Sequence, residues 1–316
     1  ARTVRARAYA SNGTTAAAKV RTRSLKGAQR ARVTLVEVYC TVRDSHGRFL
    51  TDLKEEDFTI LEAGRPQQIA VFSAERKPVH LVLLFDTSAS MARDRKLETA
   101  QEAAIGFVEA LEPDDTAALV TFSDMPRILQ PRTGDTTALE SAISSIEAKG
   151  GTALYDAILS AVQLLKGHEG RKAIILISDG RDESADGLGP GSVATFEEAL
   201  EAVLKSETAV YAIGTGARIA QEFDYLHRRT LGEILSTLAD GSGGRAYFIK
   251  KASKLKQAYR RVEDELRHQY TLAYYPPDAP AAGSIRGGRG ALWRPIEVRV
   301  SRPRARVTAR KGYYLR

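Results

Sequence analysis

The sequence contains a single cysteine, Cys40, among its 316 residues. One thiol can form neither an internal disulfide nor a cysteine-rich zinc site, so neither of these stabilises the chain. Cys40 lies among apolar residues in "VEVYCTV", which indicates a small buried side chain. The sequence also lacks any apolar run of about 18 residues, the length that a transmembrane helix needs.

Positive charge is concentrated at the two ends of the chain. Residues 1–32 and residues 286–316 each carry a net charge of +9, and the whole chain carries +8, so residues 33–285 carry −10. This asymmetry indicates contact with an anionic surface or with another copy of the chain, or simply a solvated tail and a charged sheet face. Few aromatic residues are interleaved with the arginines, so we expect no nucleic-acid binding.

The first 31 residues differ in composition from the rest. They are rich in Ala, Arg, Ser, Thr and Gly and have few large apolar side chains. Such a segment buries too little surface to fold alone, and residues 1–31 are predicted to be a basic arm or linker. Residues 14–25 within it could form a strand that adds to an open sheet edge.

Residues 32–76 and 269–316 have the alternating pattern of half-buried strands. In "VTLVEVYCTV", for example, alternate residues from Val36 to Val42 fall on one face. Each segment has too few strands to form a stable sheet alone, so we predict that both pair into one small β-sandwich module. The expected strands are 36–42, 58–61, 68–72, 270–275, 293–302 and one or more within 305–316.

Residues 77–268, between those segments, alternate strands with helices. The strands at 80–85 and 172–180 contain continuous apolar runs, typical of a parallel sheet that is buried on both faces. The pattern predicts a doubly wound, Rossmann-like α/β domain inserted in the β module, with its ligands beyond the carboxyl ends of the strands. Further strands are expected at 117–122, 128–129, 209–216 and 246–249, and helices at 96–111, 137–147, 153–167, 230–239 and 254–268.

Oxygen donors follow three of these strand ends. They lie in "DTSAS" (86–90), "KGGTALYD" (149–156) and "SDG" (178–180). The donor side chains are Asp86, Ser88, Ser90, Thr152 and Asp179. Carboxylates and hydroxyls without histidine or cysteine suit a hard cation, so we predict a site for Mg²⁺, or for Mn²⁺ or Ca²⁺, and no catalytic residues.

This pattern resembles the metal-ion-dependent adhesion site of the von Willebrand factor A domain. The resembling features are D-x-S-x-S after the first central strand, a threonine in a glycine-rich loop and an aspartate that closes a later strand. The resemblance extends in element order over residues 78–268. It implies that the hydroxyls of Ser88, Ser90 and Thr152 bind the ion directly. Asp86 and Asp179 would then act largely through bound water.

The flanking segments make the resemblance more specific. "VRDSHGRFLTDLKEEDFTILEAGRPQQIAVFS" and "IEVRVSRPRARVTARKGYYLR" are similar to bacterial VWFA-related proteins. In those proteins the A domain lies within an immunoglobulin- or transthyretin-like β module on the cell envelope or outside the cell. The resemblance therefore implies a secreted or cell-envelope protein.

We accordingly expect an adhesion or interaction protein that binds an acidic residue of a protein partner through the metal. The alternative is a self-assembling structural protein, in which residues 1–31 of one copy join the sheet edge of the next to form a ring or filament. Residues 1–31 could instead be a flexible tether between the folded body and a cell surface, and we favour the tether over assembly.

Two other interpretations of the site remain. Asp86, Asp179, Ser90 and Thr152 could merely cap helices. A metal-dependent hydrolase is less favoured, because a phosphatase of the haloacid dehalogenase type needs a second aspartate where Ser88 stands. None of the five histidines lies in the site loops to activate a serine, and no dinucleotide or P-loop motif occurs. We therefore expect no enzyme activity.

Overall fold

The computed structural model describes residues 35–168, 170–216, 229–277 and 292–315. It also assigns four strands outside these ranges, namely β1 (Arg2–Tyr9), β2 (Thr15–Thr22), β12 (Phe223–Asp224) and β16 (Ile285–Arg286). Residues 1–34 form one compact unit and residues 35–316 another. None of the described helices is both long enough and apolar enough to cross a membrane.

The N-terminal unit contains a two-stranded hairpin. β1 pairs antiparallel with β2, from Arg2 opposite Thr22 to Tyr9 opposite Thr15. A strand was expected within residues 14–25, added to the edge of another sheet. β2 lies in that segment, but it pairs with β1, which the composition of the arm did not predict.

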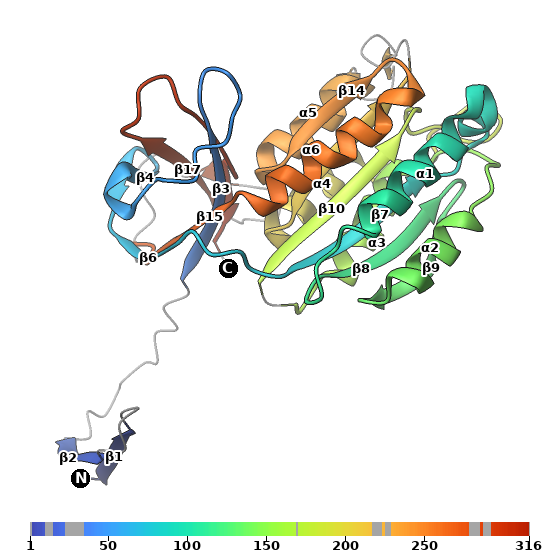
Figure 1. The fold of residues 1–316 in the computed structure, drawn as a ribbon. Coiled ribbons are helices and arrows are strands. Elements are labelled where there is room, and N and C mark those ends of the chain that lie inside the picture. Colours follow the sequence, from blue (N-terminus) through green and yellow to red (C-terminus); the bar gives the residue numbers. More distant parts are fainter. Residues whose placement is uncertain are drawn as a thin grey trace. The chain divides into compact units, whose positions relative to one another are not determined.

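A six-stranded sheet forms the centre of the second unit (Figure 1), in the order β14-β11-β10-β7-β8-β9. All neighbouring pairs are parallel except β8 and β9. The central strands are apolar at successive positions because helices cover both faces. The strands are β7 (Val79–Asp86), β8 (Thr116–Phe122), β9 (Pro126–Thr133), β10 (Arg171–Ser178), β11 (Ala209–Thr215) and β14 (Arg245–Ile249).

Helices cover this sheet on both faces, and each face has its own core. Leu81 and Leu83 of β7 pack with residues of α1, α2 and α6, whereas Val82 and Leu84 pack with residues of α3, α4 and α5. The helices are α1 (Lys96–Val108), α2 (Thr136–Ser144), α3 (Leu154–Leu164), α4 (Phe196–Ser206), α5 (Leu231–Ser242) and α6 (Leu255–Arg267). The α/β domain also contains the short 3₁₀ helices η2 (Ala89–Arg95) and η3 (Ala252–Lys254) and the short strand β13 (Arg229–Thr230). A further 3₁₀ helix, η1 (Glu55–Asp57), precedes this domain in the sequence.

In the α/β domain, α4 and β9 depart from the predictions. α4 is missing from the predicted helices, although Thr195 and Glu198 form a capping box at its start and Phe196 and Val203 are buried. β9 was expected only at 128–129 and is eight residues long. It is an edge strand with largely exposed side chains, so no apolar alternation marks its full length.

The two segments that flank the α/β domain form two antiparallel sheets, in the orders β18-β3-β15-β6 and β16-β17-β4-β5, with β19 also paired to β17. The pairs β3–β15 and β4–β17 join the first segment to the last. These strands, together called the β module, are β3 (Val36–Arg43), β4 (Phe58–Glu62), β5 (Arg65–Gln67), β6 (Ile69–Ser73), β15 (Tyr270–Tyr274), β16, β17 (Leu292–Val300), β18 (Arg306–Ala309) and β19 (Gly312–Tyr314). The predicted fold class is confirmed.

Polar contacts join the β module to the α/β domain. Glu265 of α6 accepts a hydrogen bond from Arg43 Nη2 of β3 at 3.0 Å, and another, within the α/β domain, from the Tyr247 hydroxyl at 3.0 Å. The main-chain N–H of Lys311 donates to the carbonyl of Gly241, at the end of α5, at 3.1 Å. The β module therefore contacts the carboxyl ends of two helices, α5 and α6.

A buried ion pair lies inside the β module. Arg294 Nη1 of β17 donates to Glu62 Oε1 of β4 at 2.9 Å, and both side chains are at most 1% exposed. The hydroxyls of Tyr274 and Tyr313 donate to Glu62 Oε2 at 2.7 and 2.9 Å. Such a pair is stable only while both partners are present, because removing one leaves the other charge buried and uncompensated.

We expect the variant Arg294→Met to lower the free energy of unfolding by about 3–5 kcal/mol, because Glu62 would then be buried without its cation. Arg299 on the same strand is the matched control. It pairs with Glu297 at 2.6 Å, but both side chains are more than half exposed. Arg299→Met should cost less than about 1 kcal/mol. Urea unfolding followed by circular dichroism measures both values, and equal costs would contradict the buried pair.

The second expectation concerns Cys40, which is 1% exposed in the core of the β module. Burial raises the pKa of its thiol to about 12, so the reactive thiolate is scarce at neutral pH. A thiol reagent such as Ellman's reagent at pH 8 should leave the folded chain unlabelled and should label one thiol in guanidinium chloride. Rapid labelling of the folded chain would show that this core is open to solvent.

Candidate metal centre

Two of the predicted residues follow neighbouring strands of the central sheet. β7 and β10 run parallel, with Phe85 opposite Ile177. Asp86 is the last residue of β7, and Asp179 comes directly after β10. Because the two strands end side by side, both carboxylates reach the same edge of the sheet.

The Asp86 carboxylate is completely buried and already accepts two hydrogen bonds. Its Oδ1 accepts from the main-chain N–H of Ser88 at 2.8 Å, and its Oδ2 accepts from the Ser178 hydroxyl at 2.5 Å. Burial, and then the nearby charge of Asp179, raise the pKa of Asp86 to about 6, although these hydrogen bonds act in the opposite direction. A dication bound beside it would favour the ionised form.

The two serines connect the first loop to Asp179. The hydroxyl oxygens of Ser88 and Ser90 lie 2.9 Å apart, and Ser90 donates to Asp179 Oδ1 at 2.6 Å. Ser88 is 3% exposed and Ser90 is half-buried. Three of the five predicted side chains therefore form one continuous hydrogen-bonded chain, Ser88–Ser90–Asp179.

Thr152 reaches the same place from the third loop. A Cβ atom added to Gly180 would lie 3.4 Å from Thr152 Oγ1 and 3.8 Å from Ser90 Oγ, so glycine keeps a space open between these hydroxyls. Gly151 lets the loop come close, because a Cβ there would lie 2.7 Å from the main chain at Ala185.

The structure thus brings all five predicted side chains to one edge, and helix capping does not account for the hydroxyls. Ser88 precedes η2 but makes no side-chain capping bond. The helices α1 and α3 begin after Arg95 and Ala153, neither of which caps by its side chain. Two carboxylates, three hydroxyls and the space beside Gly180 fit a hard cation. The described residues contain no group of three or more His, Cys, Asp or Glu that could hold a metal. A cation at this edge would therefore need the three hydroxyls as well as the two carboxylates.

Lys96 is a residue of this site that the sequence did not identify. Its Nζ pairs with Asp179 Oδ2, and the side chains are 19% and 1% exposed, respectively. Lys96 is the first residue of α1 and lies in the charged stretch "ARDRKLE", which is typical of a solvated surface. Only the order of the strands places it beside Asp179.

Two further aspartates near the edge hold loops in place. Asp182, 3% exposed, accepts from the main-chain N–H groups of Leu154 and Ser192, both at 2.9 Å. Asp156 of α3 accepts from Val193 and Ala194, also at 2.9 Å. Both carboxylates therefore fasten the loop after β10 to the start of α3, in line with a structural role.

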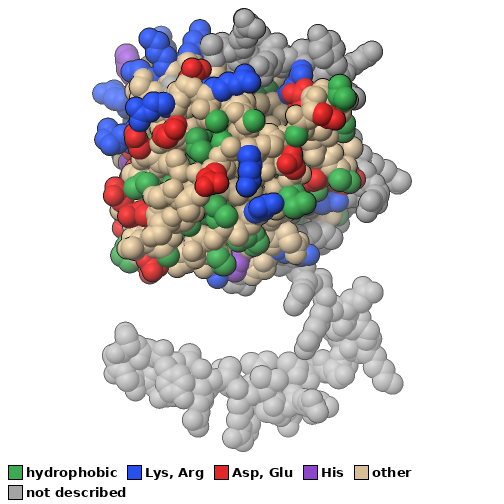
Figure 2. Space-filling model, turned by 90° about the vertical axis from the view of Figure 1, so that its right-hand side faces the viewer, with side chains coloured by type: hydrophobic (Ala, Val, Ile, Leu, Met, Phe, Trp, Pro, Cys, Tyr) green, Lys and Arg blue, Asp and Glu red, His purple; other side chains and the backbone are tan. Residues whose placement is uncertain are grey.

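The loops at this edge also expose apolar side chains. Met125 follows β8 and is 57% exposed, whereas Leu188 and Val193 follow β10 and are 88% and 97% exposed. Figure 2 shows the side of the molecule at the right of Figure 1, where small hydrophobic groups alternate with charges of both signs. A partner at this edge would meet apolar as well as polar groups.

Comparisons with known proteins support this assignment of the fold. Residues 81–181 match the family model of the von Willebrand factor type A domain. An uncharacterized protein of Synechocystis sp. is 29% identical over 59% of this chain and 41% of its own length. The human inter-alpha-trypsin inhibitor heavy chain H4 is 26% identical over 62% of this chain and 21% of its own length. The chain spans less than half the length of either relative.

Solved structures with the same fold are more distant in sequence. Proximal thread matrix protein 1 from the mussel byssus has a TM-score of 0.51 and 17% identity, covering 65% of this chain and 51% of that chain. A D319A mutant of the PilB minor pilin from Streptococcus sanguinis has a TM-score of 0.50 and 11% identity, covering 84% and 85%. Together with the family match, the fold shows that this chain contains a von Willebrand factor type A domain flanked by two small antiparallel sheets.

Proposed function

We propose that this protein is an adhesion or interaction protein that binds a carboxylate of a protein partner through a divalent cation, with Mg²⁺ as the ion that best suits the donors. The observation that carries the proposal is the meeting of Asp86, Asp179 and three hydroxyls at one edge of the sheet. These hydroxyls do not cap the adjacent helices.

The family resemblance implies that the five side chains would bind the ion in two different ways. Ser88, Ser90 and Thr152 would hold the ion through their hydroxyl oxygens. Asp86 and Asp179 would orient bound water and balance the charge. The ion would supply one exchangeable coordination position, which an aspartate or glutamate of the partner fills.

The charges of the site favour an acidic partner group. With Asp86 and Asp179 ionised and Lys96 protonated, the side chains carry a formal charge of −1. A dication changes this to +1, so the loaded site attracts an anion. The exposed Met125, Leu188 and Val193 would then contact apolar groups around that carboxylate.

We infer a location outside the cell or on its envelope, and no catalytic role. Two structural neighbours are named as a byssal thread matrix protein and a minor pilin, in keeping with an adhesive or matrix role. His80, one of the five histidines, contacts Thr116 Oγ1 at 2.8 Å. It lies at the start of β7, and Asp86 lies at the end of the same strand.

The first test is calorimetric titration of the chain with Mg²⁺ and with Mn²⁺. The isosteric variant Thr152→Val should weaken binding by roughly tenfold or more, because it removes a ligand oxygen without changing the shape of the side chain. Thr87→Val is the matched control. Thr87 lies in the same loop as Ser88, but its hydroxyl donates to the carbonyl of Phe122 at 3.0 Å. This control should bind metal like the unchanged chain.

A wild-type chain that binds neither ion would remove the proposal. Equal losses in Thr152→Val and Thr87→Val would show that the loop is damaged rather than that a ligand is missing. Once the metal site is established, a pull-down with Mg²⁺ and then with chelator should retain a partner only in the first case.

The second test concerns Lys96. The variant Lys96→Met removes a positive charge beside Asp179, so metal affinity should rise by roughly tenfold, while Lys96→Arg keeps the charge and should change it little. The loss of the Lys96 charge in Lys96→Met should also weaken the binding of acetate by the metal-loaded chain. If Lys96→Met instead binds metal more weakly, the role of Lys96 is to hold Asp179 in place.

A further inference from the structure

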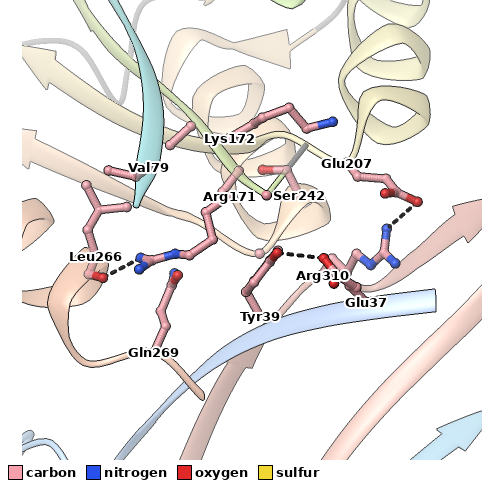
Figure 3. Close-up of a pocket in the computed structure, with 14 residues that line it drawn as sticks. Glu37, Tyr39, Val79, Arg171, Lys172, Glu207, Ser242, Leu266, Gln269 and Arg310 are labelled. Atoms are coloured by element: carbon pink, nitrogen blue, oxygen red, sulfur yellow. Dashed lines mark hydrogen bonds and ion pairs between the residues drawn. The ribbon is translucent and has the colours of Figure 1, made fainter. Parts of the chain in front are cut away.

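A small cavity lies between the β module and the α/β domain (Figure 3), with a volume of about 40 Å³. Residues at the starts of β10 and β11 line it, together with residues at the ends of α5 and α6 and residues of β3. This is the amino edge of the parallel strands, whereas Asp86 and Asp179 lie at the carboxyl edge. The cavity is therefore separate from the candidate metal centre.

Two buried arginines line this cavity on different sides of Tyr39 (Figure 3). Arg171 begins β10 and is 4% exposed, and Arg310 follows β18 and is 8% exposed. Arg171 donates to the carbonyls of Lys77, at 3.0 Å, and Leu266, but its Nε has no hydrogen-bond partner among the described residues. None of the three guanidinium nitrogens of Arg310 has such a partner.

The carboxylates of the cavity offset these charges only in part. Glu37 Oε2 accepts the hydroxyl of Tyr39 at 2.7 Å. Glu207 Oε1 forms an ion pair with Arg310 Nη1 at 3.3 Å, and the Glu207 side chain is 39% exposed.

Buried guanidinium groups that lack hydrogen-bond acceptors are costly, and an anion with several oxygens would offset that cost. Burial lowers the pKa of Arg171, which reflects the same cost. The planar fork of N–H groups on an arginine matches the oxygens of phosphates and carboxylates. A cavity of about 40 Å³ has room for a few water molecules or one small ion, but not for a nucleotide.

We propose that this cavity binds one small oxyanion, such as phosphate, sulfate or a free carboxylate, at the guanidinium group of Arg310, whose three nitrogens lack hydrogen-bond partners among the described residues. Because residues of both the β module and the α/β domain line the cavity, the ion would stabilise their junction. Glu207 would compete with it for Arg310.

The test is thermal unfolding and calorimetric titration of the full chain in EDTA, which excludes binding of the anion through a metal. Sodium phosphate and sodium acetate are each compared with sodium chloride at equal ionic strength. We expect at least one oxyanion to raise the unfolding temperature above the chloride value, since a ligand of the folded state stabilises it. The Thr152→Val variant should respond like the unchanged chain, which separates this site from the metal centre.

Two variants with opposite expectations, and one control variant, identify the residues that bind the oxyanion. Arg310→Gln should weaken oxyanion binding by roughly tenfold or more, whereas Arg306→Gln, four residues earlier and exposed, should leave it unchanged. Glu207→Gln removes the competing carboxylate and should strengthen binding several-fold. The absence of any response to phosphate and acetate in both the unchanged chain and Glu207→Gln would overturn the proposal, as would full binding by Arg310→Gln.

Discussion

The carboxyl edge of the sheet is built around two carboxylates that strand pairing places side by side. β7 and β10 are neighbours in register, so Asp86 and Asp179 emerge side by side at the carboxyl edge. Burial and mutual repulsion make two negative charges at such a place unfavourable, as the raised pKa of Asp86 shows. Hydrogen bonds from Ser178 and Ser90, and the ammonium group of Lys96, surround them. The whole edge is organised around stabilising this charge.

The two edges of the sheet have different roles as a result. At the carboxyl edge, three loops converge on Asp86 and Asp179 and leave a space beside Gly180. At the amino edge, the β module contacts the ends of α5 and α6 through Lys311 and Arg43. The β module therefore holds the α/β domain from the edge opposite the site.

Much of the fold and the site could be predicted because their signals are local in sequence. Apolar strands such as 80–85 predict a buried parallel sheet, and polar residues directly after such strands must meet at one edge. The short side chains of Asp86 and Ser88 leave little freedom once the backbone is placed. The structure therefore brings together all five side chains that the sequence identified.

Features that depend on distant contacts could not be predicted. Lys96 reaches Asp179 only because strand order brings α1 beside β10, and Glu62 meets Arg294 across 232 positions of sequence. The charged stretch around Lys96 gives no sign that this side chain has a buried partner. α4 is a different case, because the capping box at Thr195 marks its start in the sequence.

The most direct test of the central claim is a crystal structure of the chain grown with MnCl₂, with anomalous scattering used to locate the ion. We expect one strong anomalous peak within coordination distance of the hydroxyl oxygens of Ser88, Ser90 and Thr152, at the edge that carries Asp86 and Asp179. An ordered structure without a peak there, or with manganese bound only elsewhere, would contradict the account.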